Sequence, residues 1–210
     1  AVDVGDEPLM LAQSIPVVVS RARADGVALA KSQAATVILM DDGFQSPAVR
    51  KDASLIVIDS IKGIGNGKVM PAGPLRAPLA AQIERTDALL VIGDGSAADD
   101  VAERVTAAGK PVLYARFAAE EASLAALRGR HVLAFAGIGD PERFFRTLRS
   151  NGVDVAAVKI FPDHHPLSQR QIEELLFEAR RHALTLVTTE KDFARLRGTA
   201  GLPEWAHAIV

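Results

Sequence analysis

Cysteine is absent from this sequence of 210 residues. Without thiols these residues can form no disulfide, no thiolate metal site and no cysteine nucleophile, so zinc ribbons and cysteine hydrolases are excluded. Net positive charge is also lacking, because 24 lysines and arginines stand against 26 acidic residues and leave a formal net charge of −2. Without a basic field the chain is a poor candidate for non-specific nucleic-acid binding, and no nucleic-acid partner is expected.

Long apolar runs are missing as well, although 49% of the residues are hydrophobic. No stretch of about 18 apolar residues occurs, so we expect no membrane-spanning helix within this sequence. The opening residues AVDVGDEP lack the charged-then-apolar pattern of a signal peptide. They also place a dense polar cluster, of the kind that ordinarily follows a strand, at the very start. This pattern favours a chain that is shortened at its N-terminus.

Short β-branched apolar runs alternate with segments of helical period. The runs predict strands over residues 16–20, 36–40, 55–59, 88–92, 112–115, 132–136, 153–159 and 185–188. Almost all are apolar on both faces, which is typical of a mostly parallel sheet covered by helices. The sequence therefore predicts an α/β fold, with ligand sites at the carboxyl ends of the strands.

Helix and domain boundaries are also marked in the sequence. Asp140-Pro141 predicts one helix start, and Ser168 with Gln171 forms a capping-box pattern at another. An alanine- and charge-rich connection over 118–129 predicts a boundary between two domains. We place a larger domain at 1–120 and a smaller α/β domain at 121–210.

Two carboxylates, Asp41 and Asp42, follow the apolar run 36–40. An acid at the end of a buried strand can bind a hard cation such as Mg²⁺ directly or through water. Asp-Gly after a strand is also typical of an ordinary turn, so both interpretations stay open at this point.

A glycine-rich segment, GIGNGKVMPAGPLR, covers residues 63–76. Its glycines free backbone N–H groups to face anions, while Lys68 and Arg76 supply positive charge. The segment matches neither GxGxxG nor GxxxxGK followed by Ser or Thr. We favour a phosphate-binding loop, with an ordinary surface loop as the alternative.

Three more clusters carry ionisable groups. Asp6, at the start of an apparent helix, either caps that helix or acts as a general base. In FPDHHP, residues 161–166, His164 can pair with a carboxylate and move or orient a proton. The Asp-His-His triplet also fits a metal-dependent phosphoesterase, which makes a hydrolase the competing hypothesis. The third cluster, VTTEKD at 187–192, contains a capping-box pattern and is interpreted as mainly structural.

The order of these segments is more specific than any one of them. VGDEP, MDDGFQ, GIGNGKVMPAGPLRAP, AGIGDPERFF, FPDHH and VTTEKD follow one another over residues 4–192. Together they closely resemble the tetraacyldisaccharide 4′-kinase family. The resemblance implies a P-loop-type kinase of lipid A biosynthesis, which uses ATP and Mg²⁺ to phosphorylate the 4′-hydroxyl of a tetraacyl disaccharide 1-phosphate.

The resemblance also implies roles for individual residues. Asp6 is similar to the catalytic base, with His164 as its partner from the smaller domain. Asp41 is similar to the Walker-B acid that acts through Mg²⁺. The remaining implied site residues are Asp42 and Glu7 beside the metal, and Gln45, Asn66 and Arg76 at the nucleotide.

The family's phosphate-cradling Walker-A loop lies upstream of VGDEP, and no GxxxxGK followed by Ser or Thr occurs here. The resemblance therefore implies a shortened chain that is inactive alone, or that serves only as a nucleotide-binding or scaffold fragment. The family's membrane-binding helix would also lie upstream. Peripheral association with the cytoplasmic face of the bacterial inner membrane is expected from the resemblance only.

Overall fold

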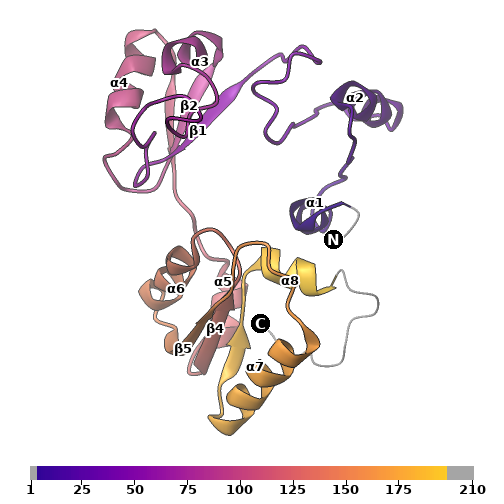
Figure 1. Ribbon diagram of the computed structural model, residues 1–210, viewed down its shortest axis with the longest axis vertical. Coiled ribbons are helices and arrows are strands. Elements are labelled where there is room, and N and C mark those ends of the chain that lie inside the picture. Colours follow the sequence, from indigo (N-terminus) through magenta and orange to yellow (C-terminus); the bar gives the residue numbers. More distant parts are fainter. Residues whose placement is uncertain (1–3, 198–210) are drawn as a thin grey trace. The chain divides into compact units, whose positions relative to one another are not determined.

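Two separate three-stranded parallel sheets are present in the computed structural model, which describes residues 4–197 (Figure 1). They belong to two units. The middle unit spans Ser20–Ala118, and the C-terminal unit combines the described residues up to Val19 with those from Ala119 onward. The N-terminal segment belongs to the C-terminal unit because helix α1 (Asp6–Leu11) packs against helix α8 (Glu190–Arg197). A division into domains 1–120 and 121–210 stays a prediction.

The middle unit is built on a sheet with the strand order β1-β2-β3. In chain order its elements are α2 (Arg23–Ser32), β1 (Leu55–Asp59), α3 (Leu79–Arg85), β2 (Ala88–Ile92), α4 (Asp99–Ala107) and β3 (Val112–Ala115). The three strands begin and end at the residues that the apolar runs predict. Helices α3 and α4 pack on one face, where Ile58, Leu89 and Val91 are buried. The opposite face leaves Leu55, Val57 and Leu113 exposed.

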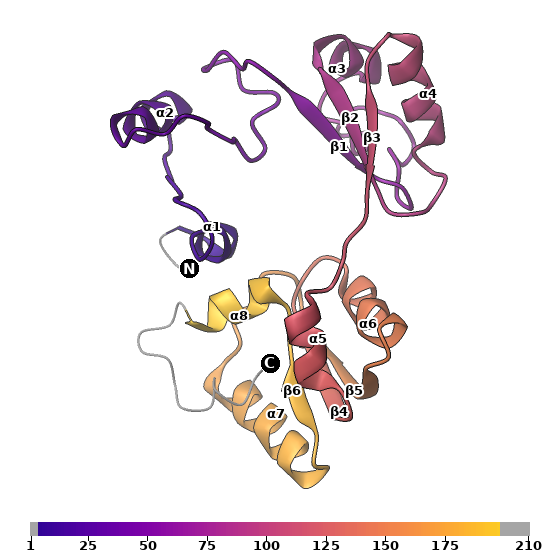
Figure 2. The same cartoon turned by 180° about the vertical axis from the view of Figure 1, so that it is seen from behind.

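The C-terminal unit has the strand order β5-β4-β6. Besides α1 and α8 it contains α5 (Glu121–Leu127), β4 (His131–Ala136), α6 (Pro141–Ser150), β5 (Asp154–Ile160), α7 (Gln169–Arg181) and β6 (Thr185–Val187). Helices α6 and α7 lie on opposite sides of this sheet (Figure 1, Figure 2). Both predicted helix starts are confirmed, since Asp140 accepts from the backbone of Arg143 and the capping box of α7 is complete.

Strand β4 is the centre of this core, and its side chains alternate between two hydrophobic clusters. Val132, Ala134 and Ala136 face the cluster that contains Phe145 of α6. Leu133 and Phe135 face the opposite cluster, which α7 and α8 complete. All these side chains are buried, so β4 is apolar on both faces, as a central parallel strand requires.

Two of the predicted strands are wrong. Residues 16–20 and 36–40 form no strand, although Val37 and Leu39 alternate in the way that a strand would. These two residues are 75% and 84% exposed. A strand is stabilised by hydrogen bonds to a neighbouring strand, and within residues 4–197 neither segment is paired with one.

Helix α7, with 13 residues, is the longest helix within residues 4–197. In the described part of the chain, no helix combines the length and the apolar character that are needed to cross a bilayer.

Candidate functional site

The two adjacent acids of the middle unit, Asp41 and Asp42, lie in a turn whose backbone is contacted by a residue of α2. Asp42 has a φ of 50°, an uncommon backbone conformation for a residue other than glycine. The guanidinium of Arg23, the first residue of α2, donates to the carbonyl oxygen of Asp42 at 2.9 Å and to that of Asp41 at 3.4 Å. Arg23 therefore fixes the backbone of the turn and leaves both carboxylates to other partners. No sequence motif singled this arginine out.

The two carboxylates differ in what they contact. Arg76 donates to Oδ2 of Asp42 at 3.0 Å, so the glycine-rich segment is tied to the acidic turn. Among the described residues, the carboxylate of Asp41 has no hydrogen-bond or ion-pair partner. Asp41 can therefore bind a cation directly, whereas Asp42 would first have to break its ion pair with Arg76. Gln45 is exposed just beyond it, with a side-chain amide that likewise has no partner within residues 4–197.

The glycine-rich segment 63–76 is folded back on itself. The side-chain amide of Asn66 accepts from the backbone N–H of Lys68 at 3.1 Å and donates to the carbonyl of Ala72 at 2.8 Å. Gly73 lies so close that an added Cβ would overlap with Oδ1 of Asn66 and with the carbonyl of Lys68. Asn66 therefore organises the loop, and both ends of its amide are already used there.

The predicted FPDHH cluster forms a turn after β5 in which the two histidines have different surroundings. The ring of His165 stacks on Phe161, and its Nε2 lies 3.2 Å from Oε1 of Gln171. The ring of His164 is exposed, while its backbone N–H donates to the carbonyl of Gly137 at 3.2 Å. His165 therefore anchors the turn, whereas the imidazole of His164 is accessible from solvent.

Helix α8 holds this turn through a buried ion pair. Asp192 accepts from Gly137 N at 3.0 Å, from the hydroxyl of Thr189 at 2.7 Å and from Arg195 at 3.0 Å. Arg195 also donates to the carbonyl of His165 at 3.3 Å. One network thus joins the loop after β4, the histidine turn and α8.

Lys191 of the same helix contacts His164 of the predicted catalytic pair, and also Glu7, the neighbour of Asp6 in the sequence. Its Nζ lies 3.0 Å from Oε1 of Glu7 on α1 and 3.5 Å from Nε2 of His164. Asp6 begins α1, but its side chain lies outside what the structure describes, so its contact with His164 stays a prediction. Lys191 and Arg195 were missed as site residues. For Lys191 the sequence signal was VTTEKD, which was interpreted as a helix cap, and Arg195 lies beyond that segment.

Within residues 4–197, no three His, Cys, Asp or Glu side chains come together as a metal-binding group. Mg²⁺ in phosphotransfer sites is usually held by one or two carboxylates with substrate phosphates and waters. Asp41 beside Asp42 fits that donor set. Glu7 is already engaged by Lys191, and a two-metal phosphoesterase centre needs more ligands than the described residues bring together.

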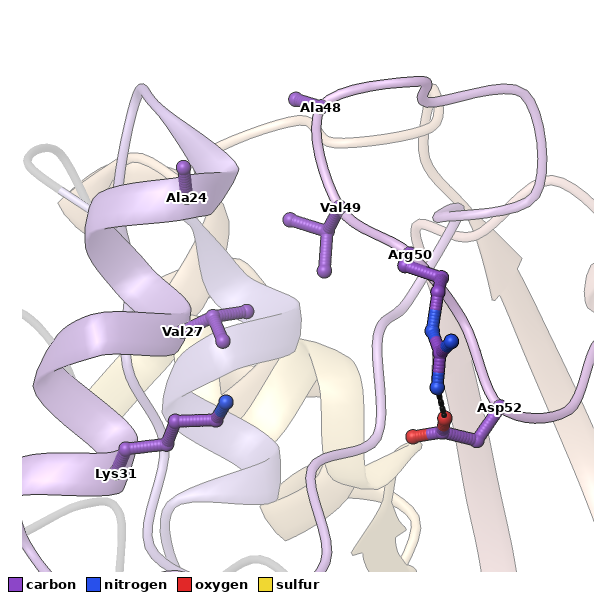
Figure 3. A pocket seen from close by; sticks show the side chains of 7 residues that line it. All are labelled: Ala24, Val27, Lys31, Ala48, Val49, Arg50 and Asp52. Atoms are coloured by element: carbon purple, nitrogen blue, oxygen red, sulfur yellow. Dashed lines mark hydrogen bonds and ion pairs between the residues drawn. The ribbon is translucent and has the colours of Figure 1, made fainter.

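A shallow pocket of about 390 Å³ lies elsewhere in the middle unit. Figure 3 shows Ala24, Val27 and Lys31 of α2 across from Val49, with Arg50 and Asp52 paired at 3.0 Å on the rim. None of the predicted site residues lines this pocket, so pocket shape alone does not locate the site.

Comparison with known proteins gives a consistent result. The family model described as LpxK, tetraacyldisaccharide-1-P 4′-kinase, matches residues 1–210. The chain is 67% identical over 203 residues to the tetraacyldisaccharide 4′-kinase of Bradyrhizobium diazoefficiens, covering 97% of this chain and 60% of that protein. It is 62% identical over 210 residues to that of Nitrobacter hamburgensis, covering 100% of this chain and 63% of that protein. The chain therefore spans about 60% of the length of these curated relatives.

A solved structure is similar as well. It is the crystal structure of the "apo" form of LpxK from Aquifex aeolicus in complex with ATP, which matches with a TM-score of 0.66 and 29% identity. The match covers 93% of this chain and 61% of that one. The predicted fold class, a P-loop-NTPase-like α/β fold with a smaller C-terminal α/β part, is thereby confirmed.

Proposed function

The chain belongs to the tetraacyldisaccharide-1-phosphate 4′-kinase family, and we propose that the protein at family length transfers the γ-phosphate of ATP to the 4′-hydroxyl of a tetraacyl disaccharide 1-phosphate. This step belongs to lipid A biosynthesis. The main support is the match of the family model to all 210 residues, together with 67% identity to a curated kinase of that name.

The proposed acid–base pair is Asp6 with His164. Asp6 accepts the proton of the 4′-hydroxyl as its oxygen attacks the γ-phosphorus, and His164 orients or receives that proton. Two observations support this assignment. Helix α1, which begins at Asp6, packs against α8, and the turn that carries His164 is fixed by the buried Asp192–Arg195 pair of the same helix.

The residues that we propose for phosphate and metal binding belong to the acidic turn of the middle unit. Asp41, assisted by Asp42, would hold Mg²⁺, which when bound neutralises charge on the transferred phosphoryl group. Arg76 is proposed to contact phosphate oxygens, since its guanidinium has five donors and Asp42 is its only described carboxylate partner. Gln45 is the proposed neighbour of the nucleotide. Asn66 acts there by shaping the loop, and Glu7 acts through its ion pair with Lys191.

No phosphate-binding GxxxxGK followed by Ser or Thr occurs in the 210 residues. The transfer is therefore proposed for a family-length form, which for experiments is this chain joined to the remaining part of a curated relative. Because the substrate is a lipid, we further propose peripheral association with the cytoplasmic face of the inner membrane.

The test is steady-state transfer by the family-length form. Asp6→Asn and His164→Gln should each lower kcat by about 10²- to 10⁴-fold, the usual contribution of a general acid or base. ATP affinity, measured by calorimetry, should stay unchanged because neither residue is proposed to bind nucleotide. His182→Gln, an exposed histidine at the end of α7, is the matched control and should turn over normally. Loss of ATP binding equal to the loss of kcat would contradict the assigned roles.

A further inference from the structure

Lys191 joins three elements of the C-terminal unit at one point. It is the second residue of α8, and its Nζ contacts Glu7 on α1 and His164 in the turn after β5. Glu7 and Lys191 are 184 positions apart in the sequence. The contact is thus part of the tertiary structure and not a local feature of α8.

The position is an unusual one for a lysine. The first turn of a helix is its positive pole, where acids are favoured and cations are not. The Lys191 side chain is also only 19% exposed, and lysines are rarely buried unless they are paired. The carboxylate of Glu7, at 3.0 Å, compensates both disadvantages. An ammonium held in this way has a fixed direction.

That direction determines what His164 can do. An ammonium has three donors and no acceptor, so it can only donate toward Nε2 of His164, which lies 3.5 Å away. Nε2 must then offer its lone pair, and in the neutral imidazole the proton is on Nδ1. The carboxylate of Asp163 does not oppose this choice, because its Oδ1 lies 3.8 Å from Nε2 and instead accepts from the backbone N–H of His164 at 3.0 Å.

We propose that Lys191 is a positioning residue with two effects. It fixes the positions of the Glu7 and His164 side chains relative to each other, and it selects the Nδ1-protonated tautomer of His164. In this tautomer Nδ1 carries the N–H that can donate a hydrogen bond to a carboxylate base. Only the effect on turnover rests on the proposed function. The tautomer itself is a property of the C-terminal unit.

The first experiment reads the tautomer in the 210-residue chain. Nitrogen-15 NMR of the imidazoles is recorded at about pH 8.5, where an imidazole of ordinary pKa is neutral. The spectrum is assigned with His164→Gln. The wild type should show a protonated Nδ1 and an unprotonated Nε2 at His164, and Lys191→Met should shift the signal toward the other tautomer. Lys191→Arg should keep the wild-type pattern because it keeps a cationic donor.

A matched control is Lys159→Met, which removes another ion-paired lysine of the same unit, 3.1 Å from Glu178. It should leave the His164 signal unchanged. If Lys191→Met does not fold, Lys191→Ala takes its place, since alanine likewise has no side-chain donor. An Nε2-protonated His164 in the wild type would overturn the proposal, and so would a Lys191→Met variant in which His164 keeps the wild-type tautomer.

The second experiment measures turnover in the family-length form. Lys191→Met should lower kcat by about 10- to 100-fold with an unchanged KM for ATP, because a misplaced catalytic group slows the chemical step. Lys191→Arg should restore most of it, and Lys159→Met should match the wild type. If the wild-type form transfers no phosphate, the proposed function fails, while the NMR result still decides the role of Lys191.

Discussion

Replacing Asp192 with alanine should destabilise the C-terminal unit strongly, because this residue anchors the loop, the turn and the helix that build the proposed site. Its side chain is 6% exposed and that of its partner Arg195 is 11% exposed. The substitution removes the carboxylate that the largely buried Arg195 guanidinium contacts at 3.0 Å, and it removes the acceptor of the Gly137 N–H.

The expected magnitude follows from these contacts. Removing one partner of a buried ion pair usually destabilises a protein by about 3–5 kcal/mol. Arg195 keeps two carbonyl acceptors, those of Gly137 and His165, so the lower end, about 3 kcal/mol, is expected here. A domain is stable by only about 5–15 kcal/mol, so the unit should still fold but should open far more often.

Native-state hydrogen exchange is the appropriate assay because it reports on each unit separately. The slowest amides of β4 should exchange about 100-fold faster in the variant, since 1.4 kcal/mol corresponds to a factor of ten. Amides of β2, in the middle unit, should be unchanged. Arg170→Ala is the control, because it breaks an exposed pair with Glu174 that should contribute less than about 1 kcal/mol. If Asp192→Ala affects β4 no more than this control does, the anchoring role of the network is refuted.

Three further substitutions test the middle unit. Asp41→Asn in the family-length form should raise the Mg²⁺ concentration needed for half-maximal transfer, and an unchanged metal titration would remove Asp41 from the proposed site. Gly73→Ala should destabilise the loop by about 1–3 kcal/mol through overpacking against Asn66, seen as faster exchange of the Lys68 and Leu75 amides. Lys110→Met should lower the free energy of unfolding of this unit in urea by roughly 1.5–3 kcal/mol, because the ammonium donates to three carbonyls at the C-terminal end of α3. An unchanged free energy would mean that water satisfies these carbonyls when the ammonium is removed.

The strands were predictable where the pairing partner is present in this chain. Residues 55–59, 88–92 and 112–115 are predicted to the residue because each apolar run finds a parallel neighbour. Residues 36–40 have the same local character and remain unpaired within the described part of the chain. A propensity for strand is a property of the segment, whereas a strand requires a second segment.

In the candidate site, too, local sequence patterns were predictable and contacts between distant segments were not. The order of the motifs was enough to recognise the family, and the family model agrees over the whole chain. The contacts of Arg23 with the acidic turn and of Lys191 with Glu7 were not predicted. They join residues 18 to 184 positions apart, and no local pattern marks a side chain that acts at such a distance. The helix-cap interpretation of Thr189 and Asp192 was sound but incomplete, because Asp192 also binds Gly137 and Arg195.

The central claim is that this chain is part of a lipid kinase, and transfer of labelled γ-phosphate from ATP to a tetraacyl disaccharide 1-phosphate tests it most directly. The family-length form and the 210-residue chain are assayed in parallel, with product analysis to locate the new phosphate. We predict 4′-phosphorylated product from the family-length form and none from the chain alone. No transfer by the family-length form, or phosphate at another hydroxyl, would contradict the claim.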